Sequence, residues 1–477
     1  MIRACGFIAV AAGLLTAARV GLSQSAPDLP QPRSVANGSG QTPHQYTGAL
    51  SCASAACHNQ SLGGPGGVVG NEYAIWATRD PHTRAFQVLY NERSKVIEQN
   101  LRGKRGQSPH PERDRLCLRC HALPNLDAMT DLDSSRVQNL LRDGVGCEGC
   151  HGAAEVWRTR HYQAGWSGLS PAEKAEIGFN DTKDLVARGR ACADCHIGNG
   201  SRDVNHDLIA AGHPRLAFEY SAFLAVLPRH WSLAAERQRY PDLEARTWVL
   251  GQAISAQAML ELLADRAKPA DKKPWPELAE YDCFSCHHDL TKAGWREQRE
   301  AKSQSHATLG YPPWQEWYTA VLRQALGQPD AVPALKKLHG EMRKPEPDRT
   351  EVGALARQAA EELNAQLPIL SARRYDDPAW LQSQLKRLAG RHDLASCSWD
   401  SAAQLYLALA AVYQAEATQV SGFGEGPIRG SLTEMRRLLR FPQGPDVRRD
   451  SPEERQVPRR QQQLLRTLDQ LQRELGR

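Results

Sequence analysis

Aromatic side chains and long hydrophobic runs are both scarce in this chain of 477 residues. Phe, Trp and Tyr together make up 6% of the sequence, and its mean hydropathy is −0.54. With so few core-forming side chains, an ordinary globular core is difficult to build unless another apolar body contributes to it. The formal net charge of +5 is too small an excess to indicate binding to nucleic acid.

An apolar run occurs at the N-terminus, and no other run in the sequence approaches membrane-spanning length. Arg3 precedes the run at 4–18, and small residues follow at 23–26, which is the pattern of a secretory signal peptide. An uncleaved membrane anchor is the alternative, although the run is short for a span. We expect residues 1–26 to be a signal peptide and the mature protein to be periplasmic or otherwise exported, without a transmembrane span.

Cysteine, in contrast, is abundant, with twelve residues. Cys5 lies in the expected signal peptide, and Cys397 stands alone, where we expect a small buried side chain rather than a reactive thiol. The other ten form five close pairs, and a histidine directly follows each pair. The five motifs are Cys52, Cys57 and His58; Cys117, Cys120 and His121; Cys147, Cys150 and His151; Cys192, Cys195 and His196; and Cys283, Cys286 and His287.

Paired cysteines in an exported protein have three common roles, namely disulfides, zinc knuckles and the attachment of c-type haem. Neither a disulfide nor a zinc ribbon requires a histidine after every second cysteine, whereas C-x-x-C-H is the haem signature and occurs four times. Cysteines three residues apart share one face of a helical turn, so both sulfurs reach one edge of a porphyrin. The next residue then offers its imidazole to the iron. The sequence therefore predicts haem c.

The first pair departs from this spacing, because four residues separate Cys52 from Cys57. The pair keeps the terminal Cys-His of the signature and stands at the head of four regular motifs, which favours a stretched haem site. A disulfide between Cys52 and Cys57, with His58 unrelated, is the alternative. The first interpretation predicts five haems, and the second predicts four.

Histidines outside the motifs are concentrated in the motif region, where each iron takes a second axial ligand or keeps an open position. Sixteen histidines less the five of the motifs leave eleven, of which nine lie between residues 44 and 306. The predicted distal ligands are His82, His161, His213, His206 and His288. His82 follows Asp80 and Pro81, which are typical of a helix start. His230 and His306 have weaker contexts.

Five stretches together resemble the multihaem cytochromes of the cytochrome c-554/c-prime family. They are YTGALSCASAACH, WATRDPHTRAF, GVGCEGCHG, CADCHIGNGSRDVNHDLIAAGHPRLAFE and YDCFSCHHDL. The resemblance covers roughly residues 46–300. It implies stacked pairs of haems, iron with two histidine ligands and, in some members, one five-coordinate haem. The family prototype carries four haems, so the five candidate sites and the stretched first motif are departures from its pattern.

The composition changes along the chain. Residues 27–45 are rich in Pro, Gly, Ser and Gln, which predicts a flexible linker. We expect residues 46–300 to form a multihaem cytochrome c domain with little regular strand and one long helix at 245–267. Residues 301–477 contain helix-length amphipathic segments and no haem motif, so we expect a C-terminal helical bundle. The predicted fold class is therefore mainly α.

Two details of the C-terminal region are specific enough to test. Ser398 or Asp400 is expected to cap the helix that follows. Leucines at positions 464, 468, 471 and 475 repeat with a helical period. Two heptads are too few for a coiled coil, so we expect an amphipathic helix that packs against the rest of the protein.

These features together predict a periplasmic cytochrome that carries electrons through about five mostly bis-histidine haems. Its partners would be redox proteins that donate and accept electrons, and no residue is identified as catalytic. The alternative is a multihaem oxidoreductase whose one open haem acts on a small nitrogen or sulfur compound. Acid and base groups between Asp203 and Arg215 would suit it, but there are enough histidines to cap all five irons.

Overall fold

Helices are the only named secondary-structure elements in the part of the chain that the computed structural model describes. That part consists of residues 44–60, 68–103, 108–123, 129, 131–269, 274–283, 286, 312–328, 330–419, 426–440 and 457–476. Two isolated β-bridges, Asn199–Arg202 and Tyr281–Trp314, are the exceptions within these ranges. The expected mainly α fold is thereby confirmed. The predicted signal peptide and nearly all of the predicted linker lie outside the described residues.

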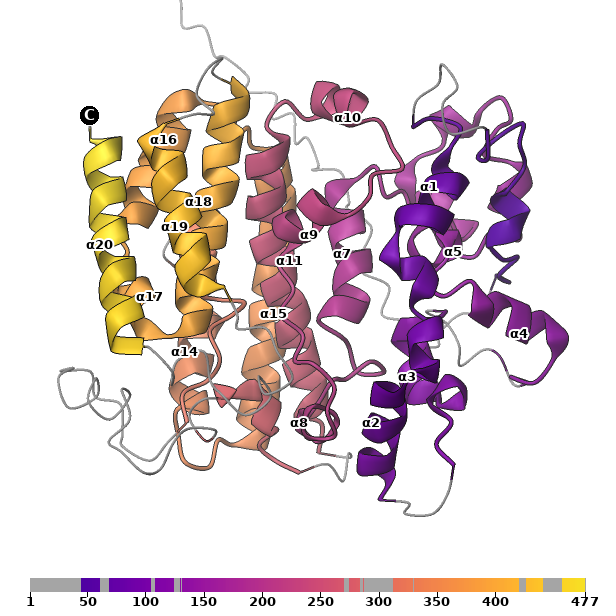
Figure 1. Ribbon diagram of the computed structural model, residues 1–477, viewed down its shortest axis with the longest axis horizontal. Coiled ribbons are helices and arrows are strands. Elements are labelled where there is room, and N and C mark those ends of the chain that lie inside the picture. Colours follow the sequence, from indigo (N-terminus) through magenta and orange to yellow (C-terminus); the bar gives the residue numbers. More distant parts are fainter. Residues whose placement is uncertain are drawn as a thin grey trace, which may run out of the picture. The chain divides into compact units, whose positions relative to one another are not determined.

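Short helices make up the motif region, which is indigo to magenta in Figure 1. Its α-helices are α1 (Glu72–Arg79), α2 (Glu92–Arg102), α3 (Arg115–His121), α4 (Ser135–Arg142), α5 (Cys147–His151), α6 (Pro171–Glu176), α7 (Leu185–His196), α8 (His206–Ala210), α9 (Tyr220–Val226) and α10 (Leu233–Arg239). Its 3-10 helices are η1 (Ala49–Cys52), η2 (Pro81–Arg84), η3 (Gln87–Tyr90), η4 (Pro111–Arg113), η6 (Trp157–Thr159), η7 (Trp166–Gly168) and η8 (Leu278–Glu280).

Side-chain caps explain where the helices that carry motifs begin. The carboxylate of Asp114 caps α3 and that of Asp184 caps α7, each by accepting a backbone N–H of the first turn. Helix α3 ends at His121, α7 ends at His196, and α5 consists of the third motif itself. Three motifs therefore lie in helical turns, which is the arrangement that brings two sulfurs to one face.

The remaining α-helices include the longest ones of the described chain. They are α11 (Leu243–Arg266), which lies within residues 46–300, and, in the C-terminal region, α13 (Leu322–Leu326), α14 (Pro333–Met342), α15 (Arg349–Ala372), α16 (Pro378–Ala389), α17 (His392–Cys397), α18 (Trp399–Gln419), α19 (Pro427–Leu439) and α20 (Val457–Leu475). Ser398 rather than Asp400 caps α18, because the N–H of Ser401 donates to Ser398 Oγ over 3.1 Å. Helix α20 is amphipathic as expected, and it packs its buried leucines against α16, α17 and α19.

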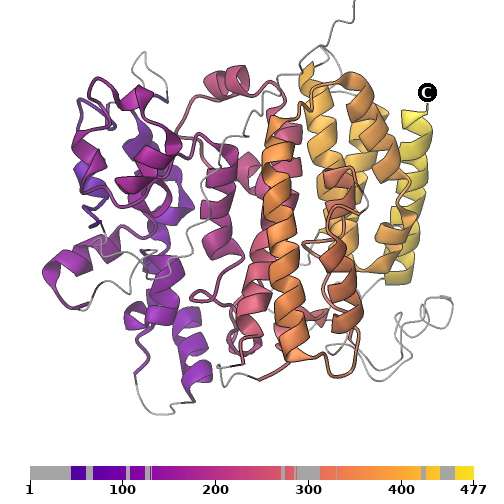
Figure 2. The same cartoon turned by 180° about the vertical axis from the view of Figure 1, so that it is seen from behind.

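Helix α11 is buried on all sides rather than along one face. The helix expected at 245–267 is present, but its buried residues include polar Gln252 and Gln257 as well as Trp248. The reason is that α11 packs against α7 and α9 on one side and against α13, α15 and α18 on others. Figure 2 shows the orange α15 running alongside it. Neither α11 nor any other helix within the described ranges is long and apolar enough to cross a membrane.

The motif region and the C-terminal helices share one hydrophobic core, to which α7, α9 and α11 all contribute. Two glycines allow this close packing. A Cβ at Gly189 of α7 would lie 2.8 Å from Ile254 Cδ1, and a Cβ at Gly251 of α11 would lie 2.7 Å from Tyr220 Cβ. Residues Gln41–Arg477 accordingly cluster as one compact unit. The division of this unit at residue 300 stays a prediction.

We expect Leu363→Ala to lower the free energy of unfolding by about 2–5 kcal/mol, because it opens a cavity where α15 packs on the shared core. Leu363 has no exposed surface. The measurement is chemical denaturation followed by far-UV circular dichroism. The control is Glu361→Ala, an exposed position on the same helix, which should change the free energy by less than about 0.5 kcal/mol. Equal effects of the two substitutions would contradict the packing described.

Candidate functional site

The motif histidines of the first four motifs each lie opposite one other histidine, although the two partners are far apart in sequence. The distances between ring centres are 6.0 Å for His58 and His161, 6.0 Å for His82 and His196, 6.4 Å for His121 and His213, and 6.3 Å for His151 and His230. Each pair joins one motif histidine to one histidine outside the motifs. The structure thus brings together three of the predicted distal ligands, His82, His161 and His213, with three motif histidines.

The spacing of these pairs matches that of two rings bonded to one metal atom. The rings of His58 and His161 are within 19° of parallel with their centres 6.0 Å apart, and the rings of the other three pairs meet at 75–84°. A metal bonded to each Nε2 at about 2 Å, with roughly 1 Å more from nitrogen to ring centre, separates the centres by about 6 Å. The residues therefore fit an iron with two axial imidazoles, and a porphyrin would supply the other four ligands.

Hydrogen bonds to backbone carbonyls fix which ring nitrogen carries a lone pair. Nδ1 of His121, His161 and His213 lies 2.9, 2.7 and 2.8 Å from the carbonyl oxygens of Ala85, Arg158 and Pro214, respectively. A carbonyl only accepts, so Nδ1 must be the donor in all three rings. Nε2 is then left unprotonated in the neutral ring, which is the form that ligates a metal.

Carboxylates orient two further rings. Asp80 Oδ1 lies 2.8 Å from Nδ1 of His82, and Glu72 Oε2 lies 3.1 Å from Nδ1 of His58. Burial opposes ionisation of Asp80, but the hydrogen bonds from His82 outweigh it and hold the pKa of Asp80 below its usual value. Asp80 also accepts the backbone N–H of His82, which confirms its expected role at the start of η2.

Desolvation keeps other rings of the pairs neutral. Burial lowers the pKa of His151 and of His196 to about 4, and it lowers the pKa values of His121, His213 and His230 as well. A neutral imidazole has a lone pair to donate, whereas an imidazolium has none. These rings are therefore ready to ligate a metal at any pH near neutrality.

His230 is the partner that the sequence interpretation ranked too low. It faces His151, it is half-buried, and its Nδ1 has no hydrogen-bond partner among the described residues. A signal was present, because Arg229-His230-Trp231 repeats the Arg-His-aromatic order of Arg160-His161-Tyr162. The local pattern around His161, a predicted distal ligand, would therefore have identified His230.

The fifth motif is only partly described. Cys283 and Cys286 lie within the described residues, whereas His287, His288 and the weaker candidate His306 do not. The predicted ligand His206 is not paired with another histidine in the described part of the chain. Its backbone N–H donates to Glu277 Oε1 over 2.8 Å, which places it beside the segment leading to this motif. Its ligand role stays a prediction.

The cysteines of different motifs lie close together. From Cys52 onward, the described cysteines are all free thiols. Cys52 lies within hydrogen-bonding reach of Cys147, and Cys120 lies within reach of Cys195. Helix α5, which consists of the third motif, contacts α7, which ends in the fourth motif. The first motif therefore adjoins the third, the third approaches the fourth, and the fourth adjoins the second.

Apolar side chains lie exposed around the histidine pairs, where a haem would cover them. Tyr162 is 71% exposed beside His161, at 5.4 Å between ring centres. Phe223 is 37% exposed and lies 5.0 Å from His196, while Leu50 is 76% exposed in the turn that leads to Cys52. The same region has two small core clusters of its own, which are separate from the shared core. One lies around Leu118 and the other around Tyr46. An additional apolar body would complete this part of the core.

A buried carboxylate connects the first motif to the third. Glu148, the second residue of α5, is 3% exposed and accepts the backbone N–H groups of Thr47, Gly48 and Ala154 at 2.6–3.0 Å. Thr47 and Gly48 precede η1, which ends at Cys52. The carboxylate therefore holds the first motif against the third.

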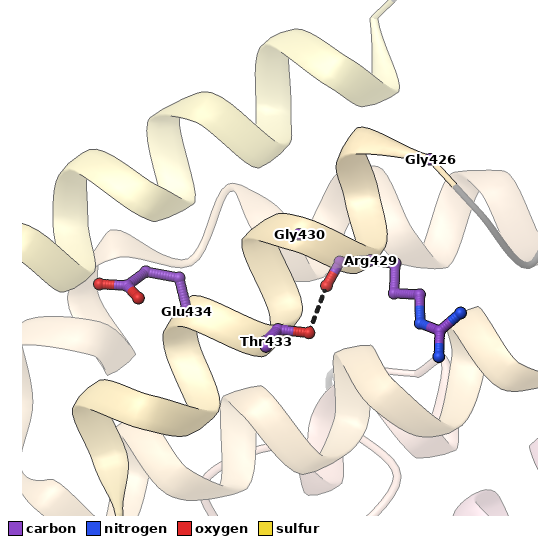
Figure 3. Close-up of a pocket in the computed structure, with 5 residues that line it drawn as sticks. All are labelled: Gly426, Arg429, Gly430, Thr433 and Glu434. Atoms are coloured by element: carbon purple, nitrogen blue, oxygen red, sulfur yellow. Dashed lines mark hydrogen bonds between the residues drawn. The ribbon is translucent and has the colours of Figure 1, made fainter.

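The hollow on α19 is not part of this site. It is lined by Gly426, Arg429, Gly430, Thr433 and Glu434, none of which is a cysteine or histidine. Figure 3 shows that Thr433 Oγ1 donates to the backbone of its own helix, at Arg429 O, while the side chains of Arg429 and Glu434 diverge. The cysteines and histidines of the first four motifs lie elsewhere, around the histidine pairs.

We expect Glu148→Gln to loosen the first motif, because a side-chain amide has one acceptor oxygen where the carboxylate has two. At least one buried backbone N–H then loses its partner, at a cost of about 1–3 kcal/mol. Hydrogen–deuterium exchange of residues 46–52 should become faster. Glu155→Gln is the control, since Glu155 accepts the backbone N–H of Gln45 at the exposed surface. Unchanged exchange in the Glu148 variant would show that the carboxylate does not hold this segment.

Comparison with known proteins gives one match. Residues 51–152 match the family model of cytochrome c554 and c-prime, over a stretch that contains the first three motifs. Neither the curated proteins nor the solved structures searched contain a match to the chain. The resemblance seen in the motifs is thereby confirmed for this stretch, because residues 51–152 are similar to the cytochrome c554 and c-prime family.

Proposed function

We propose that this protein is an exported multihaem c-type cytochrome that transfers electrons through bis-histidine haems. The family match supports a c-type cytochrome role in electron transfer. The proposal goes beyond this match in three respects, namely the number of haems, their axial ligands and the export of the chain. The observation that carries it is the spacing of the four histidine pairs at 6.0–6.4 Å between ring centres.

The proposed ligand sets combine two cysteines, a motif histidine and a distal histidine. The distal partners are His161 for the first motif, His213 for the second, His230 for the third and His82 for the fourth. For the fifth motif we retain Cys283, Cys286 and His287, with His206 and His288 as the candidate distal ligands. The bound haem supplies an iron that takes up and releases one electron.

The residues of the chain tune and protect that chemistry. Backbone carbonyls and carboxylates at Nδ1 orient the rings and make Nε2 a better donor. Two imidazole ligands favour a lower reduction potential than a histidine–methionine pair. Phe218 and Phe223 pack against His196, and Phe218 is itself buried. A second imidazole faces the motif histidine in each of the first four motifs, which supports a carrier rather than an enzyme at these sites.

The contacts between motifs suggest the order in which electrons would pass. Cys52 adjoins Cys147, helix α5 of the third motif contacts α7 of the fourth, and Cys195 adjoins Cys120. The attachment sites would then follow one another in space as first, third, fourth and second. This order differs from the order of the motifs along the chain, so the first and second motifs would lie at its two ends.

Substitution of each proposed distal ligand should open one iron. In the oxidised, haem-loaded protein, we expect His230→Ala to convert one low-spin ferric signal into a high-spin signal in low-temperature EPR. His82→Ala, His161→Ala and His213→Ala should each do the same. His392→Ala is the control, because His392 pairs with Asp469 on the C-terminal helices. A low-spin count that is unchanged in His230→Ala would remove that residue from the ligand set.

The stretched first motif has its own measurement. The intact mass of the mature protein should show five haem additions, and Cys52→Ser with Cys57→Ser should show one fewer. The control is Cys397→Ser, which should leave the haem count unchanged. Four additions in the unsubstituted protein would mean that Cys52 and Cys57 do not bind haem. A high-spin signal of one full equivalent in that protein would instead favour the alternative of an enzyme with one open haem.

A further inference from the structure

The segment that carries His213 is held from both sides by residues outside the motifs. On one side, Asn100 and Arg93 of α2 donate to the carbonyl oxygens of Ala211 and Gly212, each over 3.0 Å. On the other side, Trp317 Nε1 donates to the carbonyl of Phe218 over 2.9 Å. His213 lies between these two anchors, and its ring faces His121.

Arg215, two residues after His213, connects this segment to the C-terminal helices. Its guanidinium donates two hydrogen bonds to the carboxylate of Asp400, from Nη1 over 2.8 Å and from Nη2 over 2.6 Å. The Arg215 side chain retains 23% of its exposure and that of Asp400 retains 9%. The guanidinium also lies over the ring of Trp317, 5.9 Å from its centre. Planar bidentate pairing of this kind fixes orientation as well as distance.

The Asp400 carboxylate makes both of its side-chain hydrogen bonds in the described structure to Arg215. Asp400 is the second residue of α18, where a carboxylate often serves as a helix cap. Ser398 already provides the cap by accepting the N–H of Ser401. The carboxylate is therefore free to bind Arg215.

Arginines next to the other proposed distal ligands are not used in this way. Arg84, Arg160 and Arg229 lie within two residues of His82, His161 and His230, respectively. Within the described residues, none of these three arginines forms an ion pair, whereas Arg215 pairs with Asp400 across 185 positions of sequence. Among the described distal segments, an arginine is paired in this way at His213. The Arg215 guanidinium also lies within hydrogen-bonding reach of Cys283 of the fifth motif.

We infer that Arg215 and Asp400 are positioning residues, through which the C-terminal helices hold His213 at its distance from His121. This inference rests on the proposed function, since it takes His213 to be an axial ligand. It gives α18 a role at the second motif, although α18 carries no haem motif and lies outside the stretch that matches the cytochrome family.

The test uses the haem-loaded full chain with three variants. Asp400→Asn leaves the guanidinium without its counter-charge. The double variant Arg215→Met with Asp400→Leu removes both charges and keeps most of the volume. Asp242→Asn is the matched control, because Asp242 forms an equivalent buried bidentate pair with Arg246, at 2.8 Å for both bonds, with no paired histidine beside it. His213→Ala identifies which spectroscopic signal and which redox step belong to the second motif.

The expected change appears in the His213-dependent signal. The fifth motif is followed beside it, because Arg215 also lies within hydrogen-bonding reach of Cys283. In Asp400→Asn, the His213-dependent step of a redox titration should move to higher potential, because an unpaired cation nearby favours ferrous iron. In the double variant the same EPR signal should show a high-spin fraction or shifted g-values, because the anchor is lost even though no charge is left unpaired. Asp242→Asn should lower the melting temperature and leave every haem signal as it was.

Three results would overturn the inference. One is a double variant whose haem signals match those of the unsubstituted protein. Any effect of Asp400→Asn would then come from the unpaired charge alone and not from a lost anchor. Another is a change that affects all haem signals equally, or one that Asp242→Asn produces as well. The third is an Asp400→Asn protein with unchanged signals. If the unsubstituted protein itself lacks a low-spin signal that depends on His213, then both this inference and the proposed ligation at the second motif fail.

Discussion

A hydrogen bond at Nδ1 is the interaction that orients most of the paired histidines. Because the acceptors at His121, His161 and His213 are backbone carbonyls, the backbone itself selects the tautomer and the ring orientation. Side-chain substitution at Ala85, Arg158 or Pro214 would leave those carbonyl oxygens in place. Fixing the rings through the main chain makes the site depend on the correct path of irregular segments, which explains why so many short helices and turns surround it.

The two regions of the chain solve the problem of a core in different ways. The C-terminal helices bury leucine, alanine and tryptophan side chains around α11 and α15 in one extended cluster. The motif region contributes α7 and α9 to that cluster but has only small clusters of its own. Aliphatic side chains therefore make up for the low aromatic content in the C-terminal helices but not in the motif region. The helical region is self-sufficient in apolar contacts, whereas the motif region leaves apolar side chains exposed beside its histidines.

Local patterns in the sequence predicted the local parts of this structure. The motif helices, the cap at Asp80 and the amphipathic α20 all follow from residues within a few positions of one another. Local patterns do not show which histidines pair, because His82 faces His196 and His58 faces His161, about a hundred positions away. The same limit applies to the bond between Arg215 and Asp400. The burial of α11 on all sides was also hidden, since its polar residues suggested an exposed face that neighbouring helices in fact cover.

The contact of Glu148 with Thr47 and Gly48 has a consequence for the order of assembly. The carboxylate lies about a hundred positions after the backbone groups that it binds. Because a ribosome makes the chain from its N-terminus, the first motif exists for the time of about a hundred further elongation steps without its final support. Any modification of Cys52 and Cys57 during that interval must recognise a short linear segment. The shape that this segment finally adopts is then imposed afterwards by the third motif.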